Sequence, residues 1–134
     1  MPRPPAQHPT QVELAILRVL WQHGPSPVGI IHQAIEKQRK TSYSTTLKMV
    51  QVMFEKGILE RDESVRPHLY RPAVSQEQTQ SKLVDDLVQT AFGGVASRMV
   101  VQALSDSRIR PDELKEIREL ISKLEQKESR DDER

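Results

Sequence analysis

The segment 41–72 constrains the fold most, because it joins helix start and stop signals to two short strand-like runs. Ser44 is a favourable N-cap residue, and Gly57 suits the position that follows a last helical turn. Lys56 suits the negative end of the helix dipole. These signals predict a helix over about 45–56.

The two faces of this helix differ in character. At 3.6 residues per turn, an apolar face for the core holds Tyr43, Leu47, Val50 and Phe54. The other face holds Thr45, Lys48, Met49, Val52 and Lys56. Lysine can bond guanine or phosphate, threonine can bond base edges, and Met or Val can contact thymine methyl groups. This second face therefore suits the major groove of DNA.

The residues that follow predict a hairpin of two strands, 58–61 and 68–72, with Arg66 near its tip. A helix followed by a hairpin with a basic tip is the outline of a winged helix. Lys40 lies in a basic cluster just before the helix, where it suits a phosphate contact or the end of the preceding helix.

Two further helices are predicted ahead of this segment. Thr10 and Glu13 form a capping box, and Gly24 with the proline after it ends the first apolar run. Ser26 and Pro27 suit the N-cap and first position of a second helix. Three helices and a hairpin can bury apolar faces that none could bury alone.

We therefore expect a mainly α chain with a small β wing. The expected parts are a disordered arm over 1–9, a winged-helix DNA-binding domain over 10–74, a helical dimerisation domain over 75–128 and a frayed charged tail over 129–134. The apolar residues expected to form the dimerisation surface are Leu83, Leu87, Met99, Leu104, Leu114, Ile117, Ile121 and Leu124. The last four follow heptad spacing, which favours a second copy as partner over packing on the chain's own winged helix.

Charge is distributed unevenly along the chain. Residues 1–74 hold 10 Lys and Arg against 6 Asp and Glu, a net charge of +4, whereas residues 75–134 hold 10 against 13, a net charge of −3. The first part is therefore the part suited to a polyanion. No apolar run is long enough to cross a bilayer, so we expect a soluble, cytoplasmic protein without membrane insertion.

The sequence contains no pattern typical of an enzyme, a metal site or a cofactor site. The chain has no cysteine, which excludes disulfides, thiolate metal sites and cysteine nucleophiles. Its four histidines are scattered, without H-E-x-x-H spacing, and no glycine-rich phosphate loop follows a strand. We expect no catalytic activity, no metal and no cofactor.

Two runs carry a resemblance to a known family. YSTTLKMVQVMFEKGILER over 43–61 and RPHLYRP over 66–72 resemble the penicillinase-repressor family of bacterial transcriptional regulators, and ELAILRVLW over 13–21 is similar to its first helix. The resemblance implies a homodimeric repressor whose winged helices bind the two halves of a palindromic DNA operator. It also implies C-terminal helices that dimerise.

Carried over to this sequence, the resemblance implies that Ser44, Thr45 and Lys48 enter the major groove and that Arg66 lies beside the phosphates. The full set of expected DNA-binding residues is Lys40, Tyr43, Ser44, Thr45, Thr46, Lys48, Met49, Val52, Arg66 and His68. The chain departs from the family pattern at Val52, where arginine is common, and at Thr46, where an aliphatic residue is common.

Two routes of induction are known in the family. The copper-responsive members carry a cysteine-rich C-terminus, and the lack of cysteine excludes that route here. In the antibiotic-responsive members, a membrane sensor protease triggers cleavage of an Asn-Phe bond. The corresponding pair is Gln102 and Ala103, which makes a sensor protease a candidate partner.

Two other functions compete with DNA binding. In the first, the winged helix is a protein-protein interaction module without DNA, and Met49 and Val52 belong to an apolar docking surface. In the second, the dimer encloses an effector pocket between its C-terminal helices. The basic residues around the face of the 45–56 helix favour DNA over the first alternative.

Overall fold

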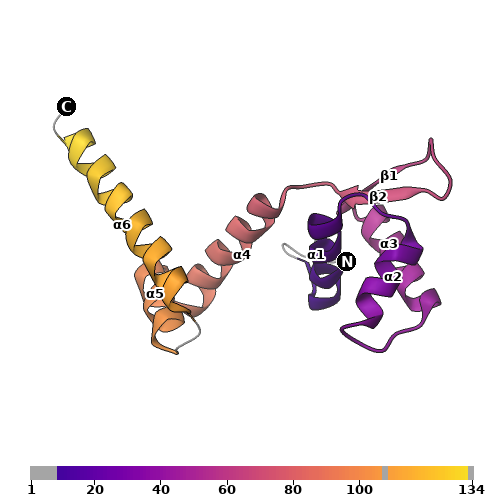
Figure 1. The fold of residues 1–134 in the computed structure, drawn as a ribbon, viewed down its shortest axis with the longest axis horizontal. Helices are drawn as coiled ribbons and strands as arrows, with labels where there is room; N and C mark the ends of the chain where they lie inside the picture. Colours follow the sequence, from indigo (N-terminus) through magenta and orange to yellow (C-terminus); the bar gives the residue numbers. More distant parts are fainter. Residues whose placement is uncertain (1–8, 107–108, 133–134) are drawn as a thin grey trace, which may run out of the picture. The chain divides into compact units, whose positions relative to one another are not determined.

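The computed structural model describes residues 9–106 and 109–132 of the 134-residue chain, so most of the expected arm over 1–9 lies outside the described residues. Six helices and two strands are present in the described ranges (Figure 1). They are α1 (Gln11–His23), α2 (Val28–Glu36), α3 (Tyr43–Glu55), β1 (Leu59–Asp62), β2 (Leu69–Pro72), α4 (Gln76–Ala91), α5 (Ala96–Ser105) and α6 (Pro111–Asp132). The mainly α fold with a two-stranded wing is confirmed.

The chain divides into two compact units between Val84 and Asp85, a point that lies inside α4. The first unit contains α1 to α3, the hairpin and the start of α4. The second contains the rest of α4, with α5 and α6.

The start of α1 is a complete capping box, as predicted. The N–H of Glu13 donates to the Thr10 hydroxyl at 3.2 Å, and the N–H of Thr10 donates to the Glu13 carboxylate at 2.9 Å. Gly24 ends the helix with φ 85°, a conformation that favours glycine. The Glu13 carboxylate is buried and also lies 3.4 Å from Lys56 Nζ, which links the start of α1 to the end of α3.

The prediction of Ser26 as the N-cap of α2 is wrong, because Pro27 holds that position without a side-chain cap. Ser26 instead pairs with β2. Its N–H donates to the Tyr70 carbonyl at 3.1 Å, and the Tyr70 N–H donates to the Ser26 carbonyl at 2.9 Å. The Ser26 hydroxyl donates to the Gly24 carbonyl at 2.8 Å. The extended backbone needed for this pairing delays the start of α2.

One apolar core holds the first unit together. Its buried members come from all three helices and both strands. They are Ile16, Leu17, Val19, Leu20, Val28, Ile31, Ile35, Val50, Met53, Leu59 and Tyr70. The core fixes α3 by one side, so the opposite side of that helix is free to bind a partner.

The hairpin packs on the C-terminal part of α3. Strands β1 and β2 are antiparallel, with Arg61 opposite Tyr70. The rings of Phe54 and Tyr70 meet edge to face with centroids 6.4 Å apart, and the Arg61 guanidinium lies 4.2 Å from the Phe54 centroid. These contacts attach the wing to α3. The loop that connects β1 and β2, residues 63–68, lies at the end of the hairpin.

A pair of glycines separates the first two helices of the second unit, and the third helix runs almost to the end of the chain. Gly93 and Gly94 have φ of 58° and 82° and separate α4 from α5. Helix α6 continues to Asp132, so the expected frayed tail over 129–134 is helical as far as the structure describes it.

Candidate nucleic-acid interface

Helix α3 starts two residues earlier than predicted, because Ser42 rather than Ser44 is its N-cap. The Ser42 hydroxyl accepts a hydrogen bond from the Thr45 N–H at 3.2 Å. It also lies 2.8 Å from the Thr45 hydroxyl and 3.2 Å from the Ser44 hydroxyl. Ser44 and Thr45 are therefore exposed on the first turn of the helix.

The face of α3 opposite the core carries an exposed polar stripe formed by Ser44, Lys48, Gln51 and Glu55. The spacing of four, three and four residues places them on one line along the helix. Lysine can bond guanine, and glutamine can bond adenine at two positions. Glu55 repels phosphate, so the half of the stripe that suits DNA is the N-terminal half.

Gln51 is absent from the residues expected to bind DNA, although its spacing from Ser44 and Lys48 places it on the same face of the helix. It is a neutral amide, whereas the expected residues of that face are cations, hydroxyls and apolar side chains. Among uncharged side chains, glutamine is well suited to base recognition, so Gln51 joins the candidate residues.

Thr46 does not belong to this surface. It was expected to contact DNA, but its side chain is buried. The residue is 3% exposed. Its hydroxyl donates to the Ser42 carbonyl at 3.4 Å and forms a 2.9 Å hydrogen bond with Nδ1 of His32. The Nε2 atom of His32 lies 3.1 Å from the Glu36 carboxylate. Thr46 therefore fastens α3 to α2 instead of facing DNA.

Three other residues of α3 differ from expectation in exposure. Tyr43, assigned to the core face, is 50% exposed and packs edge-on against His32 with ring centroids 5.5 Å apart. Met49 is half-buried and packs against the core, because it lies next to the buried side of the helix. Val52 is also half-buried. The apolar surface available on α3 is smaller than the sequence suggested.

The wing carries several ion pairs. Arg61 bonds Glu63, with 2.9 Å between Nε and Oε1, and Arg71 bonds Glu60, with 3.0 Å between Nε and Oε2. Hydrogen bonding to Tyr70 and then Glu63 raises the pKa of Arg61 above its usual range. The pKa of Glu63 is lowered by its bond to Arg61.

Asp62 shapes the turn at the start of the wing loop. Its Oδ1 accepts hydrogen bonds from the Ser64 hydroxyl at 2.5 Å and the Ser64 N–H at 2.9 Å. These two bonds lower the pKa of Asp62 below its ordinary value of 3.8.

Arg66 is the exposed cation of the wing loop, and no ion pair or hydrogen bond holds it within the described ranges. It is thus available to a phosphate. His68 is half-buried at the base of the loop, and Lys40 is exposed ahead of α3.

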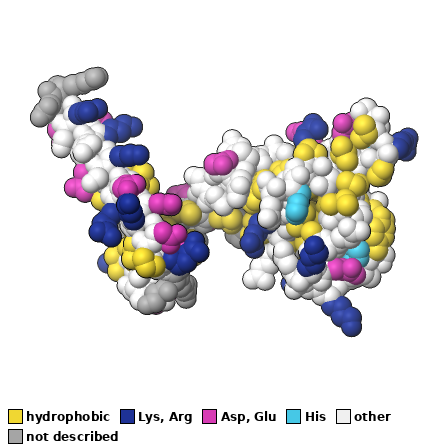
Figure 2. Space-filling model, in the orientation of Figure 1, with side chains coloured by type: hydrophobic (Ala, Val, Ile, Leu, Met, Phe, Trp, Pro, Cys, Tyr) yellow, Lys and Arg dark blue, Asp and Glu magenta, His cyan; other side chains and the backbone are white. Residues whose placement is uncertain are grey.

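The second unit exposes many large apolar side chains. Of the residues expected to dimerise, Leu87, Leu114, Ile121 and Leu124 are 46%, 39%, 45% and 56% exposed. Leu83, Met99, Leu104 and Ile117 are half-buried. Figure 2 shows hydrophobic side chains at the surface of α5 and α6 between charged ones. Gln102 and Ala103 are exposed within α5.

No cluster of three or more His, Cys, Asp or Glu residues suited to a metal occurs among the described residues. In the same part of the chain, no helix combines the length and apolar character that crossing a membrane requires.

A winged helix with an exposed polar stripe on its third helix and an exposed arginine on its wing is the architecture typical of DNA-binding transcription regulators. The model of the family described as "Penicillinase repressor" matches residues 9–123, and the chain belongs to this family. Members of the family are transcriptional regulators and not enzymes. The sequence resemblance is thereby confirmed.

The chain is also similar to three curated relatives. The transcriptional regulator BlaI of Mycobacterium tuberculosis (strain H37Rv) is 26% identical over 116 residues, which cover 85% of this chain and 83% of the relative. The penicillinase repressor of Bacillus licheniformis is 20% identical, with 84% and 88% covered. The methicillin resistance regulatory protein MecI of Staphylococcus aureus (strain N315) is 18% identical, with 85% and 93% covered. These relatives support a DNA-binding repressor.

Proposed function

We propose that the chain is a homodimeric repressor that binds a palindromic DNA operator and blocks access to a promoter. The observation that carries the DNA-binding part is the exposed stripe of Ser44, Lys48 and Gln51 on α3, with Thr45 beside it. Each of these side chains can bond base edges or phosphates in the major groove. The wing adds Arg66 for a phosphate outside that groove.

The apolar surface of the second unit supports the homodimer. Leu87, Val101, Ile121 and Leu124 are each at least 45% exposed. Large apolar side chains exposed in this number on neighbouring helices of the sequence favour an interaction site. A second copy is the partner that a two-fold operator requires, because protein symmetry and operator symmetry match.

Recovery of bound DNA from the genome, followed by fluorescence anisotropy on the recovered site, tests this function. Lys48→Ala is expected to weaken binding to the recovered site by about 10- to 100-fold, and binding to random duplex by less. Lys82→Ala removes an exposed lysine of α4 as a matched control and leaves the affinity near that of the parent protein. Absence of binding to any duplex at low salt would reject the proposed function.

Relief of repression by a membrane sensor protease, with cleavage between Gln102 and Ala103, stays a prediction. Proteases bind extended segments, so α5 must open locally before this bond is cut. Mass spectrometry of the chain from induced cells tests the route. A fragment that ends at Gln102 supports it, and an intact chain during full derepression contradicts it.

A further inference from the structure

The segment 37–42, which connects α2 to α3 (Figure 1), ends at an exposed serine in an extended conformation. This residue, Ser42, has φ −85° and ψ 157°. Within the described ranges, the N–H groups of residues 40–42 donate no backbone hydrogen bond. An exposed backbone of this kind can pair with the substrate groove of an enzyme that binds extended segments.

The residues around Ser42 follow the pattern that one class of enzyme selects. Arg39 and Lys40 stand three and two residues before it, and the half-exposed Tyr43 follows it. Both cations are exposed. Basophilic serine/threonine kinases select an arginine three residues before the acceptor hydroxyl, a second cation beside that arginine and an apolar residue after the acceptor. The order R-K-T-S-Y over 39–43 supplies all three.

Ser64 in the wing shows that spacing alone does not make such a site. Arg61 also stands three residues before it, but this guanidinium is bound to Glu63. The two residues that precede Ser64 are acidic, and its hydroxyl donates to Asp62. The cation that a kinase would need is engaged there. The side chain of Arg39, in contrast, makes no ion pair or hydrogen bond among the described residues.

A phosphate on Ser42 would meet hydrogen-bond donors that are already in place. The Ser42 Oγ accepts the Thr45 N–H at 3.2 Å and lies 2.8 Å and 3.2 Å from the hydroxyls of Thr45 and Ser44. Phosphoserine adds a charge of about −1.5 to −2, which a helix N-terminus stabilises. The same charge borders the first turn of the helix proposed to enter the major groove, where it repels DNA phosphates.

We propose that Ser42 is the acceptor of a basophilic serine/threonine kinase and that its phosphate releases the protein from DNA without unfolding α3. In the transfer, Ser42 Oγ bonds the γ-phosphorus of a nucleoside triphosphate, and the bond from that phosphorus to the bridging oxygen breaks. The nucleoside diphosphate leaves with the electrons of that bond, and the hydroxyl proton passes to a base of the kinase. The effect on DNA rests on the proposed function and supplies a reversible route of release.

Incubation of the full chain with a purified basophilic kinase and ATP, followed by mass spectrometry, tests the site. Phosphate is expected on Ser42 and not on Ser64. Arg39→Gln is expected to slow incorporation by about 10-fold or more, because the kinase loses its main contact. Lys37→Gln removes an exposed cation five residues before the acceptor and is the matched control, with a rate within about two-fold of the parent. Absence of phosphate on Ser42, or a rate independent of Arg39, would overturn the inference.

The phosphorylated protein gives the functional readout. Anisotropy at low salt is expected to show at least about 10-fold weaker binding to the recovered operator and to random duplex. Its Tm is expected to be no lower than that of the unmodified chain. The loss of affinity shrinks as salt rises, because screening weakens the repulsion, and phosphatase treatment restores binding. Equal affinity before and after phosphorylation, or a loss that accompanies unfolding, would contradict the proposed release.

A pair of substitutions isolates the charge. Ser42→Asp and Ser42→Asn have nearly the same shape, and both side chains cap helices well. The aspartate variant is expected to bind DNA about 3- to 10-fold more weakly than the asparagine variant, with a similar Tm. Equal affinities of the two variants would refute the electrostatic effect.

The outcomes also separate this inference from the proposed function. If the unmodified protein binds no duplex, the proposed function falls together with the release from DNA. If the unmodified protein binds its operator and the phosphorylated protein binds equally, only the release falls.

Discussion

Thr46→Val tests the internal role of Thr46. Valine keeps the shape of threonine but removes the hydroxyl that bonds Nδ1 of His32 at 2.9 Å and the Ser42 carbonyl at 3.4 Å. The side chain of His32 is 12% exposed, so its Nδ1 loses a partner in a place that water reaches poorly. An unpaired buried polar group costs about 1–3 kcal/mol, and the middle of that range lowers Tm by about 8–16 °C for a domain of this size.

Thr45→Val is the matched control, because it makes the same chemical change one position away on the exposed face. The Thr45 hydroxyl bonds the exposed Ser42 hydroxyl at 2.8 Å, where water can replace it, so stability is expected to change by less than about 0.5 kcal/mol. Loss of a hydrogen bond to DNA is expected to weaken operator binding by about 3- to 10-fold.

The assays are thermal unfolding by circular dichroism and anisotropy at a temperature where both variants are folded. Thr46→Val is expected to unfold earlier and to bind the operator within about two-fold of the parent protein. The reasoning is refuted if Thr46→Val keeps its Tm and loses DNA affinity, since that result would make Thr46 a DNA contact.

Three further changes extend these expectations. Leu17→Ala empties a fully buried site in α1 and is expected to cost about 2–5 kcal/mol, measured by urea unfolding. Ile121→Lys places a charge on the exposed apolar surface of α6 and is expected to shift the protein toward monomer in sedimentation. The lowered pKa of Asp62 predicts an NMR titration midpoint below 3.8. The pKa of Asp62 is lower in the folded state than in the unfolded state. Its carboxylate therefore stabilises the fold above pH 3.8, and this stabilisation is lost as the pH falls through the folded pKa. Ser64→Ala is expected to return the midpoint toward 3.8.

Local signals predicted those parts of the fold that depend on neighbours in sequence. The Thr10 and Glu13 capping box fixed the start of α1, and Gly24 fixed its end. The hairpin followed from two short runs either side of a polar loop. In each case the residues that decide the structure lie within a few positions of one another, so the sequence contains the contact.

The errors at the start of α3 have a different cause. Thr41, Ser42, Ser44 and Thr45 can all cap a helix, and local propensity does not choose among them. The structure selects Ser42, which moves the first turn and exposes Tyr43. Because α3 begins two residues earlier than predicted, Tyr43 belongs to its first turn and is exposed there.

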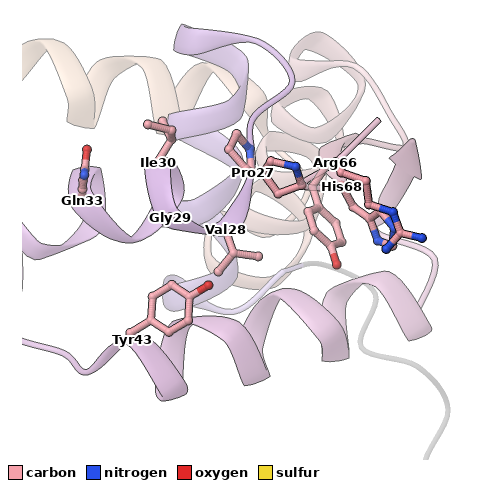
Figure 3. Close-up of a pocket in the computed structure, with 10 residues that line it drawn as sticks. Pro27, Val28, Gly29, Ile30, Gln33, Tyr43, Arg66 and His68 are labelled. Atoms are coloured by element: carbon pink, nitrogen blue, oxygen red, sulfur yellow. The ribbon is translucent and has the colours of Figure 1, made fainter. Parts of the chain in front are cut away.

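Long-range contacts explain the remaining differences. The partner of Thr46 is His32, 14 residues away on another helix, and no local pattern indicates that bond. Ser26 likewise pairs with Tyr70 of β2, far along the chain. An open groove lined by Gly29, Tyr43 and Arg66, among others, is assembled from α2, α3 and the wing, so it exists only in the folded domain (Figure 3).

Hydroxyl-radical footprinting on the operator recovered from the genome tests the central claim most directly. A homodimer with one winged helix on each half-site predicts two protected regions related by the operator's two-fold axis, with centres about 34 Å apart or a multiple of that distance. Lys48→Ala is expected to weaken protection of both regions together. A single protected region, or no protection at concentrations where the protein is folded, would contradict the homodimeric repressor.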